Sequence, residues 1–169
     1  PVMTTLGVTT LISDSGVTRY RVNTEEWMMY DRKKPSYWAF EKGVYMEQFD
    51  SIFNVEASIK ADTAYYYDKE RLWKLIGNVD IQNRKGERFN TELLYWNEAT
   101  QKVYSDKFIR IQQPDRIITG HGFDSNQQMT IYTIRNIEGI FYVDEEASSG
   151  PPQPETKALP DSVNKDTAK

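Results

Sequence analysis

The amino-acid sequence predicts an all-β protein with one domain, built from short antiparallel strands. Three observations lead to this fold class. Apolar and polar residues alternate in several short segments, turn-forming residues separate those segments, and no long stretch carries a helical stripe of apolar side chains. The 169 residues, 38% of them hydrophobic, are sufficient for one core and too few for two large domains.

The predicted strands follow one another along the chain with little between them except turns. Residues 25–30 are assigned to a strand because their flanks outweigh a possible helical turn. Alternation, or a run of aromatic and β-branched residues, marks the other predicted strands, at residues 17–22, 44–46, 65–67, 79–81, 109–111 and 129–134. Glycine, proline, asparagine and aspartate mark the predicted turns, at residues 14–16, 31–35, 83–86, 97–100, 113–115 and 120–122.

The chain also repeats itself. An offset of 30 residues aligns Trp73 with Val103 and Val79 with Ile109, and an offset of 35 residues aligns Trp38 with Trp73. A unit of about 30 residues with two strands cannot cover its own apolar face. We therefore expect successive units to stack around one elongated interior.

Composition excludes several classes of protein and site. The net charge of −4 does not provide the basic surface that nucleic-acid binding needs. The absence of cysteine excludes disulfides, thiolate metal sites and a cysteine nucleophile, and one histidine excludes a multi-histidine metal centre. Neither a phosphate-binding glycine-rich loop nor a serine nucleophile motif is present. We predict no catalytic residue, no metal, no cofactor and no nucleic-acid partner.

Four carboxylates and the single histidine remain as candidates for chemistry. Asp62 and Asp68 recur at matching repeat positions as Glu92 and Glu98, where they could form a glycosidase pair or mark solvated strand ends. A catalytic pair needs two unlike environments, so repetition favours solvated strand ends. His121 could act as a general base, but the glycines on both sides favour a turn between two strands.

Four sequence blocks resemble a known protein family. The block TTLISDSGVTRY at residues 9–20 is similar to the opening signature of the LptC family, and residues 37–50 are similar to the family's next block. Residues 61–66 and 72–79 resemble the repeated unit of the wider OstA-like superfamily. The resemblance covers residues 5–143.

This resemblance implies an elongated, open antiparallel β-jelly-roll with the shape of a taco, over residues 1–146. It also implies a non-catalytic carrier and scaffold for lipopolysaccharide that works in the periplasm, anchored to the inner membrane by a segment preceding residue 1. Such a protein receives lipopolysaccharide from the inner-membrane ABC transporter complex and passes it to a periplasmic bridge protein of the LptA type. An open sheet edge would bind these partners by strand addition.

The repeat and the alternation together predict which residues line a lipid-binding trough. Residues in register on successive hairpins share one face, and the intervening residues, such as Asp80 and Arg110, are polar. A carrier needs a continuous apolar trough, because exposing acyl chains to water costs about 0.8 kcal/mol per CH₂ group. The predicted inner trough consists of Trp38, Phe40, Val44, Met46, Trp73, Leu75, Val79, Ile81, Val103, Ile109 and Ile111.

The sequence also allows an alternative function and an alternative architecture. The alternative function is a carbohydrate-binding or carbohydrate-processing β-domain that uses Glu92, Glu98 and aromatic platforms, and the alternative architecture is a closed β-sandwich. Residues 147–169 are expected to form a disordered tail, because they contain almost no large apolar residue.

Overall fold

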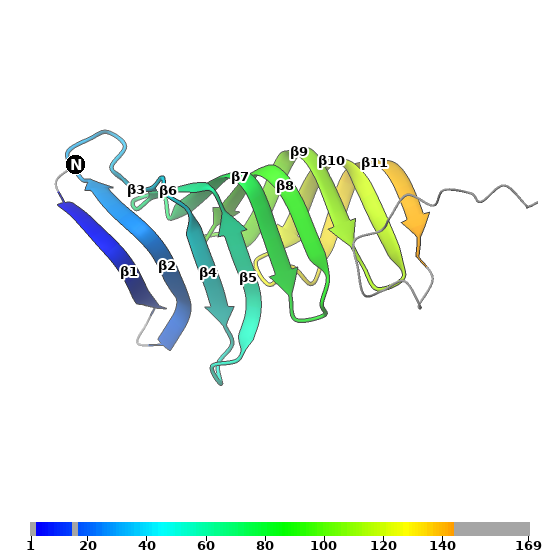
Figure 1. The fold of residues 1–169 in the computed structure, drawn as a ribbon, viewed down its shortest axis with the longest axis horizontal. Coiled ribbons are helices and arrows are strands. Elements are labelled where there is room, and N and C mark those ends of the chain that lie inside the picture. The colour runs from blue at the N-terminus through cyan, green and yellow to red at the C-terminus, as the bar shows by residue number, and fades with distance from the viewer. Residues whose placement is uncertain (1–2, 15–16, 144–169) are drawn as a thin grey trace, which may run out of the picture.

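The part of the chain that the structure describes forms one antiparallel sheet of eleven strands, which follow one another along the long axis of the molecule (Figure 1). The computed structural model describes residues 3–14 and 17–143, and all regular structure within them is strand. The strands are β1 (Met3–Asp14), β2 (Val17–Tyr30), β3 (Tyr37–Phe40), β4 (Val44–Phe49), β5 (Val55–Ala61), β6 (Thr63–Tyr67), β7 (Leu72–Asn83), β8 (Arg88–Asn97), β9 (Lys102–Gln112), β10 (Arg116–Asn126) and β11 (Tyr132–Tyr142). The predicted fold class, including the strand at residues 25–30, is confirmed.

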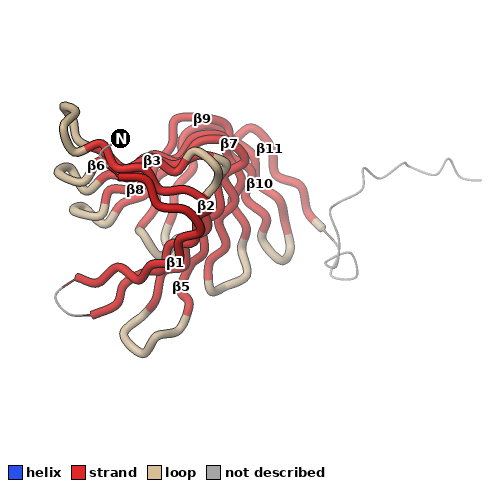
Figure 2. Tube along the Cα trace, turned by 60° about the vertical axis from the view of Figure 1, so that its left-hand side comes forward, coloured by secondary structure: helices blue, strands red, loops and turns tan. Residues whose placement is uncertain are grey.

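Two long strands change partners along their length, and this folds the sheet into two layers. The first half of β2 pairs with β4, and its last three residues pair with β3. Likewise, β7 pairs with β6 over residues 72–76 and with β5 over residues 80–83. We call the half of the folded sheet that contains β4 and β5 the β4–β5 layer, and the half that contains β3 and β6 the β3–β6 layer. A long strand such as β7 contributes one segment to each layer. Figure 2 shows the sheet curving over between the two sets of hairpin loops.

The line along which the sheet folds, here called the bend, crosses the long strands near their middles. In β7 the backbone turns at Gly77 and Asn78, with φ values of 82° and 46°, and the pairing with β8 shifts register there. In β10 it turns at Gly122, where φ is 83°. Glycine adopts this left-handed conformation without the steric penalty of a Cβ, so the strand changes direction and continues.

The predicted turn at residues 120–122 is therefore wrong. His121 lies inside β10, which runs from one layer to the other through the bend. The glycines bend the strand instead of reversing the chain. Residues 129–131 also differ from the prediction, because β11 begins only at Tyr132 and the Met129 amide donates to the carbonyl of Asn126 in a turn (3.1 Å).

The other predicted turns within the described residues connect successive strands at the side opposite the bend, here called the open side. They comprise residues 31–35, 83–86, 97–100 and 113–115. The last strand ends at Tyr142. The predicted tail at residues 147–169 lies outside the described residues, as does the end of the predicted domain at residue 146.

Candidate functional site

The eleven predicted trough residues lie on the inner face of the folded sheet, between the two layers. Ten are buried, and Trp38 is partly buried and packs against the same core. Strand pairing explains why the repeats contribute to one surface. Trp38 pairs with Tyr66, which pairs with Trp73, and two further pairings continue this row to Val103. Facing residues in paired strands share a face, so each unit adds its side chains to the same row.

The intervening polar residues lie on the outer face. Asp80 pairs across the strands with Asn90 and forms an ion pair with Arg88, at 3.0 Å. Arg110 faces Asn90 in the same outer row. The alternation predicted from the sequence thus separates a polar outside from an apolar inside.

The interior is filled by its own side chains. Trp73, Leu75, Val79 and Ile109 have no measurable exposure. Aromatic rings run along the β3–β6 layer, with ring centroids 4.9 Å apart for Trp38 and Tyr66, 4.6 Å for Tyr66 and Trp73 and 6.3 Å for Trp73 and Trp96. Such a surface can hold apolar chains by contact and burial.

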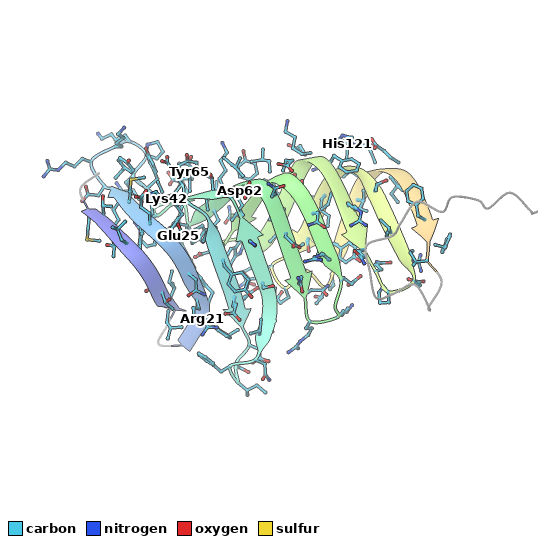
Figure 3. All side chains as sticks on the ribbon, viewed as in Figure 1. Arg21, Glu25, Lys42, Asp62, Tyr65 and His121 are labelled. Carbon is cyan, nitrogen blue, oxygen red and sulfur yellow. The ribbon has the colours of Figure 1, made fainter. Side chains whose placement is uncertain are left out.

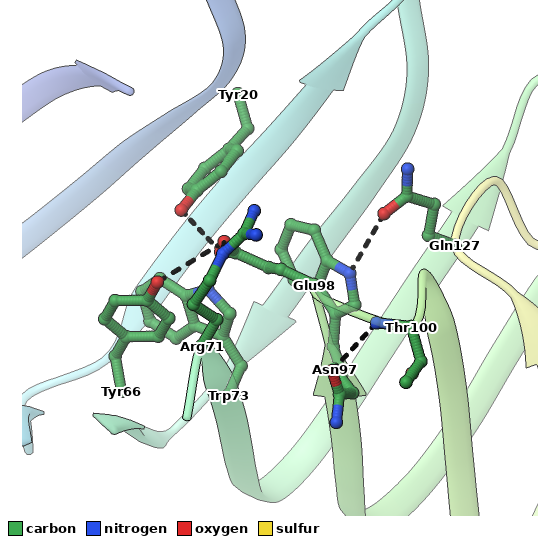
Figure 4. A network of polar contacts seen from close by, with 9 residues as sticks. Tyr20, Tyr66, Arg71, Trp73, Asn97, Glu98, Thr100 and Gln127 are labelled. Carbon is green, nitrogen blue, oxygen red and sulfur yellow. Dashed lines mark hydrogen bonds and ion pairs between the residues drawn. The ribbon is translucent and has the colours of Figure 1, made fainter. Parts of the chain in front are cut away.

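A buried carboxylate closes this interior at the open side (Figure 4). Glu98 accepts hydrogen bonds from the Tyr20 hydroxyl at 2.6 Å, the Trp73 indole at 2.8 Å and the Tyr66 hydroxyl at 3.3 Å. The Arg71 Nε atom lies 3.7 Å from the same carboxylate. Tyr20 belongs to the β4–β5 layer, whereas the other groups belong to the β3–β6 layer. The Tyr20–Glu98 hydrogen bond therefore joins the two layers.

Burial and the Glu98 charge hold both tyrosines of this cluster in the protonated form. Burial first, and then the nearby carboxylate, raise the pKa of Tyr20 and the pKa of Tyr66 well above the usual tyrosine range. Protonated hydroxyls can donate to the carboxylate, so the cluster keeps its hydrogen bonds across the physiological pH range.

A second polar cluster joins the layers nearer the C-terminal end of the sheet. The Tyr132 hydroxyl, in the β3–β6 layer, donates to Glu87 at 2.5 Å and accepts from the Gln113 amide at 2.5 Å. The Asn83 amide donates to the Met129 carbonyl in the opposite layer at 2.8 Å. Burial and then the bond to Glu87 raise the pKa of Tyr132 to about 12.

The carboxylates that repeat in the sequence do not share one environment, so the expectation of solvated strand ends is wrong for Glu98. Its side chain is only 11% exposed, because the turn after β8 places it against Tyr20 of the other layer. Glu92 and Asp62 are exposed at the bend, and Asp68 accepts from the Ser36 hydroxyl at 2.6 Å. Glu92 and Glu98 lie at the bend and the open side respectively, and therefore do not form a catalytic pair.

The single histidine lies on the outer surface at the bend, where Figure 3 labels it together with Asp62. The His121 ring contacts Phe108 edge-on, with centroids 5.5 Å apart, and its Nδ1 atom pairs with Glu138. A hollow of about 1120 Å³ at the bend includes His121 and Phe108 in its lining. The side chain does not reach the interior, so it takes no part in the trough.

Sequence reasoning missed both polar clusters. Tyr20 ends the block that resembles the family's opening signature, but neither that block nor the segments around Glu87 and Tyr132 indicates a contact partner. Each of the three residues meets its partner only after the sheet folds. The one available signal was Glu98, the repeated carboxylate, but repetition alone did not indicate that a tyrosine from β2 would cover it.

A family model described as lipopolysaccharide-assembly, LptC-related, matches residues 8–141. The chain belongs to this LptC-related family. The family implies a role in lipopolysaccharide transport. A comparison with curated proteins returns no match. Across residues 3–14 and 17–143 there is no helix long and apolar enough to cross a bilayer.

Proposed function

We propose that this LptC-related protein is a non-catalytic carrier that holds the acyl chains of lipopolysaccharide between its two layers. The observation that carries the proposal is the continuous apolar inner face, to which all three repeat units contribute in register. Covering acyl chains is favourable by about 0.8 kcal/mol per CH₂ group. The eleven trough residues, from Trp38 to Ile111, would make these contacts.

The proposal includes transfer of lipid between neighbouring proteins. Both ends of the sheet support it, since among the described residues β1 pairs only with β2 and β11 pairs only with β10. Their outer backbone groups are available for strand addition. As the family resemblance implies, lipopolysaccharide would come from the inner-membrane ABC transporter complex and pass to a bridge protein of the LptA type. An anchor preceding residue 1 would hold the protein at the inner membrane.

Photo-crosslinking tests the carrier directly. A photoreactive amino acid replaces Val79 or Ile109 on the inner face, with Asp80 and Arg110 on the outer face as matched controls. We expect lipopolysaccharide adducts from the two inner positions and few from the outer ones. Crosslinking from the outer positions alone would refute the proposal.

The carbohydrate-binding alternative predicts a different ligand. In the same assay, soluble oligosaccharide without acyl chains is added in excess as a competitor. A carrier that binds acyl chains keeps its crosslinks to lipopolysaccharide, whereas a carbohydrate-binding domain loses them.

A further inference from the structure

The filled interior leaves acyl chains no space unless the two layers move apart. Trp73, Leu75 and Val79 are fully buried, and their neighbours across the interior pack directly against them. At the bend the backbone itself passes from one layer to the other, as in β7 and β10. Separation at the bend would break strands, so the layers must part at the open side.

At the open side, side chains join the layers. The Tyr20 hydroxyl reaches Glu98 at 2.6 Å, and the Tyr132 hydroxyl reaches Glu87 at 2.5 Å. In both contacts a tyrosine of one layer donates to a carboxylate of the other. Hydrogen bonds to charged groups are stronger than those between neutral groups.

We propose that the Tyr20–Glu98 and Tyr132–Glu87 contacts are two latches, which keep the empty interior shut and break when an acyl chain enters. This inference rests on the proposed carrier function and adds the step that controls access to its interior. The latches differ from ordinary core contacts because each carboxylate keeps a partner in its own layer. Glu98 retains the Trp73 indole, and Glu87 retains the Asn83 amide at 2.9 Å.

The surroundings of the first latch allow it to open. A polar hollow of about 360 Å³ lies at the open side beside Tyr20 and Glu98, between loops of both layers. Its lining includes the amide side chains of Gln48, Gln101 and Gln128. When the latch breaks, the freed hydroxyl can bond to water there, so it does not become a buried unsatisfied group.

The ring of Tyr20 links the latch to the interior. It packs in T-shaped geometry against Trp96 and Trp73, with ring centroids 5.3 Å and 6.4 Å away. A chain that displaces Tyr20 therefore exposes the aromatic row of the β3–β6 layer. The latch stands directly over the surface that the acyl chain would occupy.

Spin labels on opposite rims of the open side would report the opening. The chain has no cysteine, so Ser51→Cys and Gln101→Cys carry the labels without any background. Both residues are exposed, line the polar hollow and belong to different layers. We expect added lipopolysaccharide in detergent micelles to lengthen the distance between the labels.

The decisive variant is Tyr20→Phe with Tyr132→Phe, which removes two hydroxyls and keeps both rings. We expect a longer label distance without lipid and a lipid uptake about tenfold faster, given the strength of hydrogen bonds to charged acceptors. Tyr65→Phe is the matched control, because its hydroxyl donates to Glu41 on the outer face at 3.1 Å. That control should leave distance and uptake rate unchanged.

The outcomes separate the latches from the carrier function. If the unmodified protein takes up no lipopolysaccharide, the proposed function fails. If lipid crosslinks to position 79 while the label distance stays constant, or if the double variant takes up lipid no faster than the Tyr65→Phe control, the latches are wrong. Circular dichroism of each variant verifies that it is folded. Glu98→Gln provides a weaker acceptor of the same shape, so it must change the label distance and the uptake rate in the same direction as the double variant, but by less.

Discussion

Strands β9 and β11 have the same length, eleven residues each, and lie in the same sheet, yet β11 is much less buried than β9. In β9, buried residues alternate with exposed ones, and Val103, Ile109 and Ile111 are at most 1% exposed. In β11 no residue is buried, although it contains Ile137, Ile140 and Phe141. β9 has a strand on both sides, whereas within residues 3–14 and 17–143 β11 pairs only with β10.

The difference shows that burial in this fold comes from stacking and not from the apolar content of a strand. An internal strand is covered by neighbours on both sides and by the opposite layer. The terminal strand lacks one neighbour, so most of its apolar side chains stay exposed, at 57% for Ile137 and 59% for Phe141. In stacked repeats such an uncapped end is typical of a surface that another unit covers.

The largest effect on stability is expected when a charge is placed among the buried side chains of an internal strand. Val79→Arg should lower the free energy of unfolding by at least about 4 kcal/mol, because the guanidinium is left in an apolar interior without a partner. Urea denaturation measures the loss. Asp80→Ala and Arg110→Ala, on the outer face, should each change stability by about 1 kcal/mol or less. Val79→Thr has nearly the same shape as the original residue, so lipid binding by this variant is compared with lipid binding by the unmodified protein.

A substitution that creates a cavity tests the same difference between internal and terminal strands, with a smaller expected loss of stability. Leu75→Ala, in the fully buried row, should destabilise the protein by about 2–5 kcal/mol. Ile137→Ala on β11 should cost about 0.5 kcal/mol or less, because the side chain is largely exposed already. Equal losses at the two positions would contradict the difference between internal and terminal strands.

High pH should destabilise the protein, in part through Tyr132 of the terminal strand. The pKa of Tyr132 in the folded state is about 12, raised by burial and by its bond to Glu87. Because the unfolded value is about 10, its stabilisation is complete below pH 10 and declines as pH rises toward 12. We expect urea denaturation to show stability falling over this interval and Tyr132→Phe to make the fall less steep. An unchanged slope in that variant would exclude this tyrosine as the cause.

The smallest effect on stability is expected at the exposed edge. Phe141→Lys should leave the unfolding free energy within about 0.5 kcal/mol of its original value. It should nevertheless weaken binding to a bridge protein of the LptA type, because it removes exposed apolar surface from the strand that would receive the partner. Surface plasmon resonance with both variants measures this, and Gln82→Lys, in an exposed position of internal strand β7, is the control.

The strands, and the face of the sheet on which each side chain lies, were predictable because both depend on local alternation of apolar and polar residues. Val79 and Asp80 differ in polarity and are adjacent, so one had to face in and the other out. The bend was not predictable from the same pattern. Gly120 and Gly122 are equally compatible with a reversal and with a kink, and only the pairing of β10 with β9 and β11 distinguishes them.

The polar clusters were beyond sequence reasoning for a related reason. Tyr20 and Glu98 are 78 residues apart, and no periodic pattern connects two residues that meet across a folded sheet. Glu98 occupies a repeated position, yet its burial depends on one tyrosine of a different strand. A sequence repeat predicts the structure that its units have in common. The polar clusters depend on residues that differ from one unit to the next.

The direction of stacking sets how the length of this molecule relates to the length of its chain. Strands are added side by side along the long axis (Figure 1), each contributing about 4.8 Å. One more hairpin would therefore lengthen the apolar interior by about 10 Å without changing its cross-section. The length of the interior therefore depends on the number of hairpins. A longer apolar interior can be built by inserting hairpins or by joining whole molecules edge to edge.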